Sequence, residues 1–378
     1  MSDYNQFDCH RRFISADNGS VVDNFWDALP SDKMLTLDPD YVFPVFDIGT
    51  YRTLFSEVDV ALPFDALTDK ELELVKLPNG SNECSKAELI KWWGDAIVDH
   101  IYKAWDPTKF HLVFHSSGWD SRAVSGAVWR GVREELGWDW DWDDVLFVCI
   151  GPESDEFKCI MEYEGWEDYQ YVAVTDMISH YDRCLDFHDA WQWLNGPINL
   201  GYNMNWVLIE HLQREGLVPE HDDDIQLFTG RNDVVFEVSA GSDCTLKRDY
   251  LHNYSAVTSS VLYKVDDLVL PLMSYDVVRT LATSTARVGY ASMRRDLVAY
   301  MDEGLAKFNR IQDPFPTMEI GQHERAIQDY KESWYGQNVH PSLKSSSAIL
   351  SYDEWWSRWT CAVIVEHLLE EGYDITIG

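Results

Sequence analysis

The middle of the chain alternates between two hydrophobic periods, and this alternation limits the fold more than any other feature. Short apolar runs of strand length occupy residues 111–115, 145–151 and 169–174, and the first of them leads into a helical pattern over about 123–136. Another run, residues 225–230, follows a further helical stretch. Strands that alternate with helices are typical of parallel sheets. The sequence therefore predicts an α/β fold with a doubly wound, mostly parallel sheet.

Composition divides the chain into two parts. Residues 1–84 mix Pro, Gly and Asp with short apolar runs, which indicates loops and short strands. At Ser85 a serine N-cap precedes apolar residues at three- and four-residue steps, and this pattern predicts a helix that ends before Asp106. After about Asp243 the sequence is mainly helical with loops. We expect an N-terminal appendage over residues 1–84 and one large domain over residues 85–378.

The chain is strongly acidic along its whole length. It has 30 Lys and Arg residues against 65 Asp and Glu residues, a net charge of −35. Such a field repels nucleic-acid phosphates and anionic membranes, so we expect neither a nucleic-acid partner nor a membrane partner. Uniform acidity also keeps proteins hydrated in high salt, and it is consistent with a halophilic host or a virus of one.

The cysteines and the N-terminus indicate the compartment. Seven cysteines include no C-x-x-C pair, and an odd number cannot all be paired, so we interpret them as reduced thiols. The first residues lack an apolar signal core, and no apolar stretch is long enough to span a bilayer. We therefore expect a cytoplasmic protein.

The segment after the strand at residues 111–115 has the composition of an anion-binding turn. Ser116, Ser117 and Gly118 let the backbone wrap an anion closely, and the helix that follows adds its positive end. Asp120 would repel a phosphate unless a cation lay between them. The simplest solution is a Mg²⁺ ion that bridges Asp120 and phosphate oxygens. The sequence thus predicts a magnesium-dependent phosphate site at the carboxyl end of this strand.

The same turn carries a resemblance to a known family. Residues 116–121, SSGWDS, resemble the SGGxDS pyrophosphate loop of the PP-loop ATP pyrophosphatases, with Ser117 in place of the second-position Gly. Four further segments resemble asparagine synthetases in order and approximate spacing. They are the helix at 88–101, the strands and acid-headed helix at 146–176, the signature QLFTGRNDVVF at 226–236, in which one residue is missing, and LVLPLMSYDVVRTLA at 268–282. The likeness to the family's C-terminal synthetase domain runs from about Lys86 to the C-terminus.

This resemblance implies a set of ATP and Mg²⁺ ligands. The residues that would hold the ATP phosphates are Ser116, Ser117, Gly118, Asp120 and Ser121. The residues that fall where the family touches the nucleoside are His115, Ile150, Thr229 and Gly230. Asp120 and Asp233 match the two magnesium-binding aspartates. In the family a late lysine stabilises charge on the α-phosphate, and Lys344 is our first candidate for it, with Lys331 as the second.

The chain also departs from the family pattern. Asn232 and Val234 replace a Gly and a Glu of the second signature, while Val269 and Ser274 replace the Arg and Asp of RxPFLD. The second metal position and aspartate as the substrate are therefore open. We expect no counterpart of the family's N-terminal glutaminase domain, because residues 1–84 are too short for one. Ammonia would come from solution or from a separate glutaminase, or the nucleophile would be another amine.

Three functions follow from these residues. The leading one is an ATP-dependent ligase that adenylates a small-molecule carboxylate, releases pyrophosphate and forms an amide with ammonia or another amine. The second is a PP-loop enzyme of nucleobase modification, although such relatives often use paired cysteines or a basic RNA-binding face, and this chain has neither. The third is a catalytically decayed synthetase fold that serves as a binding or assembly protein, which the altered second signature favours.

Overall fold

The computed structural model describes the chain in separate stretches. These are residues 12–22, 24–39, 53–61, 81–115, 118–131, 144–151, 169–173, 204–230, 267–284, 290–307, 330–339 and 352–378, with residues 4, 6, 69, 72, 73, 265 and 328. The predicted site residues that lie outside these stretches are Ser116, Ser117, Asp233 and Lys344. For Ile150 the backbone alone is described.

The main sheet has five strands in the order β7-β6-β5-β8-β9, and every neighbouring pair is parallel. Its strands are β5 (Phe110–His115), β6 (Val145–Gly151), β7 (Tyr169–Ala173), β8 (Ile225–Phe228) and β9 (Asp267–Val269). The chain starts the sheet at its centre with β5, adds β6 and β7 on one side, and then adds β8 and β9 on the other. The predicted mixed α/β fold with a parallel sheet is confirmed for these residues.

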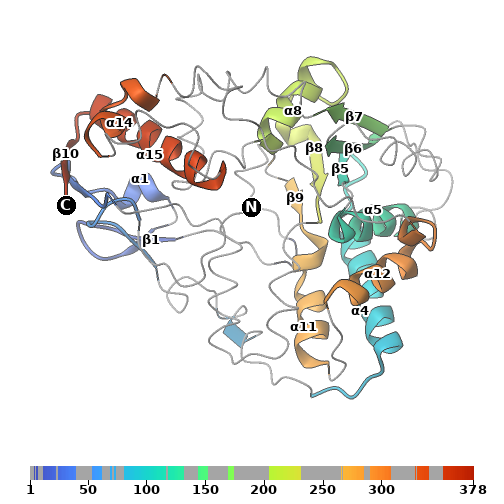
Figure 1. Ribbon diagram of the computed structural model, residues 1–378. Coiled ribbons are helices and arrows are strands. Elements are labelled where there is room, and N and C mark those ends of the chain that lie inside the picture. The colour runs from blue at the N-terminus through green and yellow to red at the C-terminus, as the bar shows by residue number, and fades with distance from the viewer. Residues whose placement is uncertain are drawn as a thin grey trace.

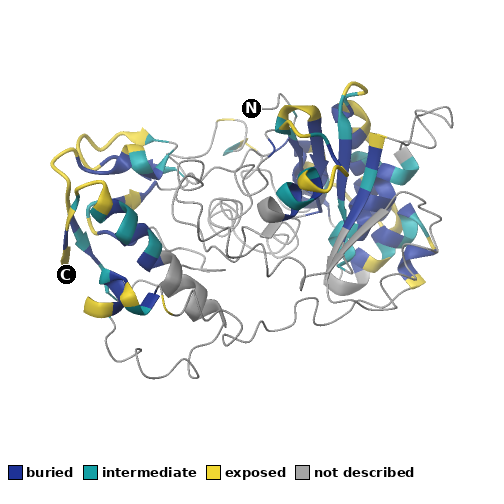
Figure 2. Cartoon of the chain, turned by 90° about the horizontal axis from the view of Figure 1, so that it is seen from above, coloured by how far each residue is buried: buried dark blue, intermediate teal, exposed yellow. Residues whose placement is uncertain are grey.

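Burial on both faces explains why β8 forms a central strand. All four of its residues, Ile225, Gln226, Leu227 and Phe228, are buried, although successive side chains point to opposite faces of a sheet. Its one polar side chain is satisfied, because Gln226 Nε2 donates to the carbonyl of Ala104 at 2.8 Å. Figure 2 shows that the strands in this part of the molecule are largely coloured as buried.

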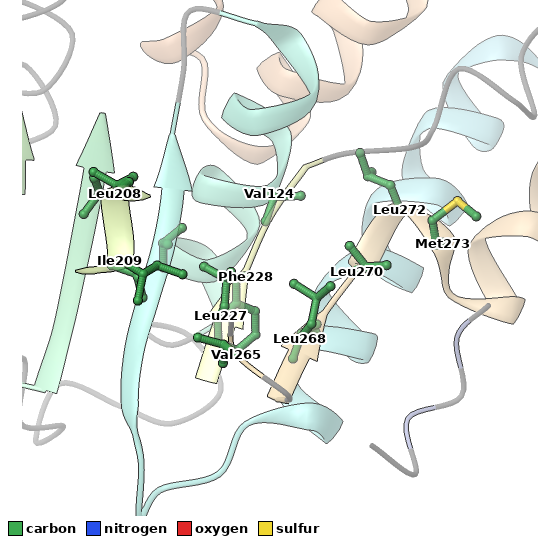
Figure 3. Close-up of a cluster of buried hydrophobic side chains, with 14 of the residues drawn as sticks. Val124, Leu208, Ile209, Leu227, Phe228, Val265, Leu268, Leu270, Leu272 and Met273 are labelled. Carbon is green, nitrogen blue, oxygen red and sulfur yellow. The ribbon is translucent and has the colours of Figure 1, made fainter. Parts of the chain in front are cut away.

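The same region contains several helices. They are α4 (Lys86–Ala104), α5 (Trp119–Gly131), α8 (Met204–Arg214), α11 (Tyr275–Thr283) and α12 (Tyr290–Met301), with short 3₁₀ helices at Asp222–Asp224, Pro271–Met273 and Leu305–Lys307. Helix α5 packs against β5, α4 and α12. Figure 3 shows the core these elements share, with Val124 of α5, Leu208 and Ile209 of α8, and Leu227 and Phe228 of β8.

Helix α4 begins and ends where the sequence predicts. Ser85 and Glu88 form a capping box, in which the Ser85 hydroxyl accepts from Glu88 N at 3.3 Å and the Glu88 carboxylate accepts from Ser85 N at 2.8 Å. Most of the predicted apolar face is buried, including Trp93, but Trp92, which the pattern also places on that face, is 41% exposed. A Cβ atom on Gly94 would lie 2.4 Å from the Tyr300 ring, so glycine lets α4 approach α12 closely at this point.

One expectation about the position of an element is wrong, and another left out a strand. Helix α5 begins at Trp119, not near Ala123, so Asp120 lies in its first turn. The reason is that Arg122 N already bonds the carbonyl of Gly118, at 3.2 Å. The region after Asp243, which was expected to be mainly helical with loops, also contains β9, which pairs with β8 and completes the sheet on that side.

A second group of elements comes from both ends of the chain. It contains β1 (Phe13–Ile14), β2 (Val21–Val22), α1 (Phe25–Ala28), β3 (Met34–Leu37), β4 (Asp59–Val60), α14 (Trp334–Asn338), α15 (Tyr352–Glu370) and β10 (Asp374–Ile377). β1 pairs with β2 and β4, while β3 pairs in parallel with β10. Figure 1 shows α1, α14, α15 and β10 together, on the opposite side of the molecule from α4, α5 and α12.

The first residues also bind to the main sheet. The Gln6 side chain donates to the carbonyl of Leu268 at 2.8 Å and accepts from Leu270 N at 2.9 Å, so it follows the edge of β9. Tyr4 donates its hydroxyl to Asp267 at 2.5 Å. Residues of the expected appendage therefore contribute to the structure of the expected large domain.

No helix among the described stretches combines the length and the apolar character that crossing a membrane requires.

Candidate functional site

The strand order places one edge of the sheet where ligands usually bind. β5 and β8 are neighbours, but β5 leads to β6 on one side of the sheet and β8 leads to β9 on the other. In open α/β sheets the crevice outside the carboxyl ends of two such strands is the common ligand site. Gly118 and α5 follow the carboxyl end of β5, and Thr229 and Gly230 follow the carboxyl end of β8. Two segments that the sequence linked to ATP therefore lie at this edge.

Gly230 brings these two segments into direct backbone contact. A Cβ atom at Gly230 would lie 2.5 Å from the carbonyl carbon and oxygen of Asp120 and 2.6 Å from Ser121 N. Only glycine fits so close to another backbone. The buried Thr229 fixes the approach from the other side, since its N–H donates to the carbonyl of Val269 at 3.3 Å. The turn after β8 thus lies on the first turn of α5.

Asp120 forms an ion pair with an arginine that was not among the predicted site residues. The Arg294 guanidinium on α12 donates to a carboxylate oxygen of Asp120 at 2.6 Å. The Arg294 side chain is 5% exposed and that of Asp120 is 24% exposed, so the carboxylate is the partner nearer to solvent. Hydrogen bonds between ionised groups at this distance are among the strongest in proteins. The pair ties the start of α5 to α12.

The helix pattern around Arg294 holds the signal that could have identified it. Leu297, Val298 and Met301 follow at steps of three, four and seven residues, and all three are buried. Arg294 lies on the same stripe, so a charge occupies the apolar face of α12. A charged residue on an apolar face needs a partner in the folded protein. Its partner, Asp120, could not be read from the sequence.

A second buried guanidinium lies in the first turns of α5. Arg122 is fully buried, donates to the carbonyl of Leu305 at 3.1 Å, and stacks on the ring of Trp119 with 4.7 Å between the guanidinium carbon and the ring centroid. Arg122 in the first turns of α5 and Arg294, the partner of Asp120, are thus two buried cationic groups. The described charges at the start of α5 thus favour an anion, although the chain as a whole carries a net charge of −35.

Both histidines of β5 are neutral parts of the core. His115 is 3% exposed, and its Nδ1 lies 2.8 Å from the Ser125 hydroxyl. Burial, helped by the charge of Arg122, lowers the pKa of His115 to about 3. His111 stacks on Trp105 with ring centroids 3.6 Å apart, and burial lowers its pKa to about 4. His115 therefore lies at the predicted edge of the sheet, but with almost no surface for a nucleoside.

The described lysine candidate lies elsewhere. Lys331 lies three residues before α14, which packs against α15. Figure 1 shows these two helices on the opposite side of the molecule from α5. The structure therefore brings Gly118, Asp120, Ser121, Thr229 and Gly230 together and does not bring Lys331 to them.

The described residues could bind a magnesium ion only together with ligands from a substrate and from water. Among the described residues, no three His, Cys, Asp or Glu side chains are grouped so that they could hold a metal. Mg²⁺ often binds through one or two carboxylates together with substrate phosphates and water, rather than in an all-protein cage. Asp120, partly exposed at the start of α5, fits the role of one such carboxylate.

Comparison with known proteins gives this site no outside support: no protein-family model matches the chain, and no curated protein matches it.

Proposed function

We propose that this chain is an AMP-forming, ATP-dependent carbon–nitrogen ligase of the asparagine synthetase type. Its substrates would be a small-molecule carboxylate and either ammonia or another amine. The doubly wound PP-loop fold belongs to the same proposal, and the strand order β7-β6-β5-β8-β9 with its reversal at β5 and β8 supports it.

One observation carries the proposal. The turn after β8 packs its Gly230 backbone against the peptide between Asp120 and Ser121, at the start of α5. The resemblance to the asparagine synthetase family assigns both segments to the same ATP molecule. Their contact at the carboxyl edge of a parallel sheet supports a shared role in nucleotide binding.

The charges around this contact suit a polyphosphate. Arg294, the partner of Asp120, supplies positive charge from a buried position, where an interaction with an anion is screened less by water. The first turn of α5 adds its backbone N–H groups and the positive end of the helix dipole. A triphosphate is the common biological ligand that uses all three features.

The proposed reaction has two steps. A carboxylate oxygen of the substrate attacks the α-phosphorus of ATP, and the bond to the β-phosphate oxygen breaks, which releases pyrophosphate and leaves an acyl-adenylate. The amine then attacks the acyl carbon, loses a proton and expels AMP, which leaves an amide. When bound, Mg²⁺ would neutralise charge on the phosphates. The chain's own groups would hold the phosphates in line with the attacking oxygen and stabilise the charge that develops.

Release of pyrophosphate and AMP tests the proposal. Purified protein with Mg-ATP is offered a panel of amino acids and other carboxylates, with ammonia or primary amines. We expect both products to form in equal amounts with at least one pair of substrates. Asp120→Asn should reduce the rate by on the order of a hundredfold or more, because fixed charges at the reacting phosphates contribute this much in other enzymes.

A matched variant tests whether the loss of rate is specific to Asp120 or follows from removing any carboxylate. Asp223→Asn removes a carboxylate from an exposed 3₁₀ turn and should leave the rate unchanged. Thermal unfolding of both variants checks that they are folded. Equal rates for Asp120→Asn and wild type would remove Asp120 from the mechanism.

A second function is supported by the ion pair between Asp120 and Arg294. A carboxylate already bound by a guanidinium could serve structure alone, and the chain would then be a synthetase-like protein that binds nucleotide without turning it over. Calorimetry with Mg-ATP, run beside the product assay, separates the two functions. Binding with no product under any substrate pair would favour the non-catalytic protein, and absence of binding would exclude both.

A further inference from the structure

The ion pair at the start of α5 is asymmetric in its burial. Arg294 lies almost wholly inside the protein, while Asp120 keeps 24% of its side chain exposed. A ligand that arrives from solvent therefore reaches the carboxylate first. The guanidinium lies deeper in the protein, on α12, and α12 is not part of the turn around Gly118.

This arrangement constrains how a cation could use Asp120. If the carboxylate moved to a cation, the buried Arg294 would lose a partner at 2.6 Å. Breaking a buried ion pair by removing one partner is strongly unfavourable unless another charge replaces it. A cation alone therefore has little access to Asp120, whereas a cation that arrives with an anion leaves both charges paired.

We propose that Arg294 is an anion-binding residue of this site, which Asp120 holds in place until a magnesium-bound pyrophosphate group replaces the carboxylate as its partner. The proposal rests on the proposed function, which brings such a group to the start of α5. A guanidinium suits this role because its planar set of N–H donors matches phosphate oxygens. The cation and the anion would then bind together rather than one at a time.

Binding of inorganic pyrophosphate tests the proposal without any turnover. Calorimetry and thermal unfolding are measured with MgCl₂ alone, with pyrophosphate alone and with both, for the wild type and for Arg294→Gln. The wild type should respond weakly to each component and strongly to both together. Arg294→Gln should bind magnesium pyrophosphate on the order of tenfold to a hundredfold more weakly, as expected for the loss of a hydrogen bond to a charged group.

The response to Mg²⁺ alone separates a binding role from a structural one. Arg294→Gln releases the Asp120 carboxylate, so MgCl₂ alone should raise the melting temperature of this variant more than that of the wild type. A residue that only supports the fold would lower both responses together, and that result would overturn the proposal. Unchanged affinity for magnesium pyrophosphate would overturn it too.

Matched variants complete the experiment. Arg295→Gln removes the neighbouring guanidinium on α12, which bonds the carbonyl of Ala306, and should leave pyrophosphate affinity unchanged. If Arg294→Gln does not fold, Arg294→Lys keeps the charge but loses the planar donors, and its affinity should fall severalfold; no fall would contradict the role. If the wild type binds Mg-ATP but Arg294→Gln binds it equally well, this inference alone fails. If the wild type binds neither Mg-ATP nor magnesium pyrophosphate, the proposed function fails with it.

Discussion

Gly230 is the residue on which the candidate site depends most directly. Its backbone lies where a Cβ atom would overlap Asp120 and Ser121. We predict that Gly230→Ala lowers the free energy of unfolding by about 1–3 kcal/mol, the usual cost of overpacking, because the turn after β8 must move away from α5. Urea unfolding measures this change, and calorimetry should show weaker binding of Mg-ATP in the same variant.

Gly19→Ala is the matched control for that substitution. Gly19 has a φ of +72°, and a Cβ atom added to it would meet no other atom within 4 Å, so the variant strains its own backbone without touching the site. It should lose stability and keep the nucleotide affinity of the wild type. Equal nucleotide affinities in the two variants would contradict the role we give to Gly230.

The sequence could predict one half of the key ion pair but not the other. Asp120 stands in a local pattern of serines and glycine, so its position in a phosphate turn can be read from its neighbours. Arg294 is recognisable only by what it contacts, and that contact joins residues 174 positions apart. Local patterns report on local structure, whereas a partner on another helix is set by the packing of the whole domain.

Among the helices, α4 offers the clearest test of how far its capping residues stabilise the fold. Ser85→Ala removes the side-chain oxygen that accepts from Glu88 N, and it leaves the Glu88 carboxylate without the serine hydroxyl. We predict a loss of about 1 kcal/mol in the free energy of unfolding, the typical value for an N-cap. The midpoint of urea unfolding measures it, at an unchanged slope.

Ser81→Ala is the control for this variant, since Ser81 is exposed and precedes the helix. It should leave the midpoint within a few tenths of a kcal/mol of the wild type. A loss as large as that of Ser85→Ala would mean that the capping box contributes nothing specific.

Most strands of the main sheet and the long helix α4 were predictable, but β9 was not. The strand predicted at residues 145–151 coincides with β6, and the apolar steps after Ser85 match α4. β9 has only three residues and passes at once into the 3₁₀ helix at Pro271–Met273, so it has no period for a pattern to reveal. Its place in the sheet comes from pairing with β8.

Across the whole molecule, buried histidines make stability depend on pH. Burial lowers the pKa of His100 and of His111 to about 4, and that of His115 to about 3, from the ordinary value of 6.5. Below pH 6.5 the unfolded chain therefore binds protons that the folded chain does not. This contribution to stability is complete above about pH 6.5 and is lost as the pH falls toward 4. We predict little change in the free energy of unfolding from pH 7.5 to about pH 6.5, and a fall from there to pH 5.

His111→Phe tests the origin of that fall. The variant keeps an aromatic ring against Trp105 and removes one titrating group, so its stability should depend less steeply on pH. His221→Gln, a change at an exposed histidine, should keep the slope of the wild type. Urea unfolding at a series of pH values measures both, and identical slopes for His111→Phe and wild type would contradict the explanation.

The parallel pairing of β3 with β10 has a consequence for biosynthesis. Met34 pairs opposite Asp374, so one strand leaves the ribosome long before its neighbour has been translated. Contacts between such distant segments form late, because closing a long loop costs entropy before the contact repays it. The parallel sheet around β5 can be assembled from nearer segments, and the group of elements around β3 is then the last part of the nascent protein to mature.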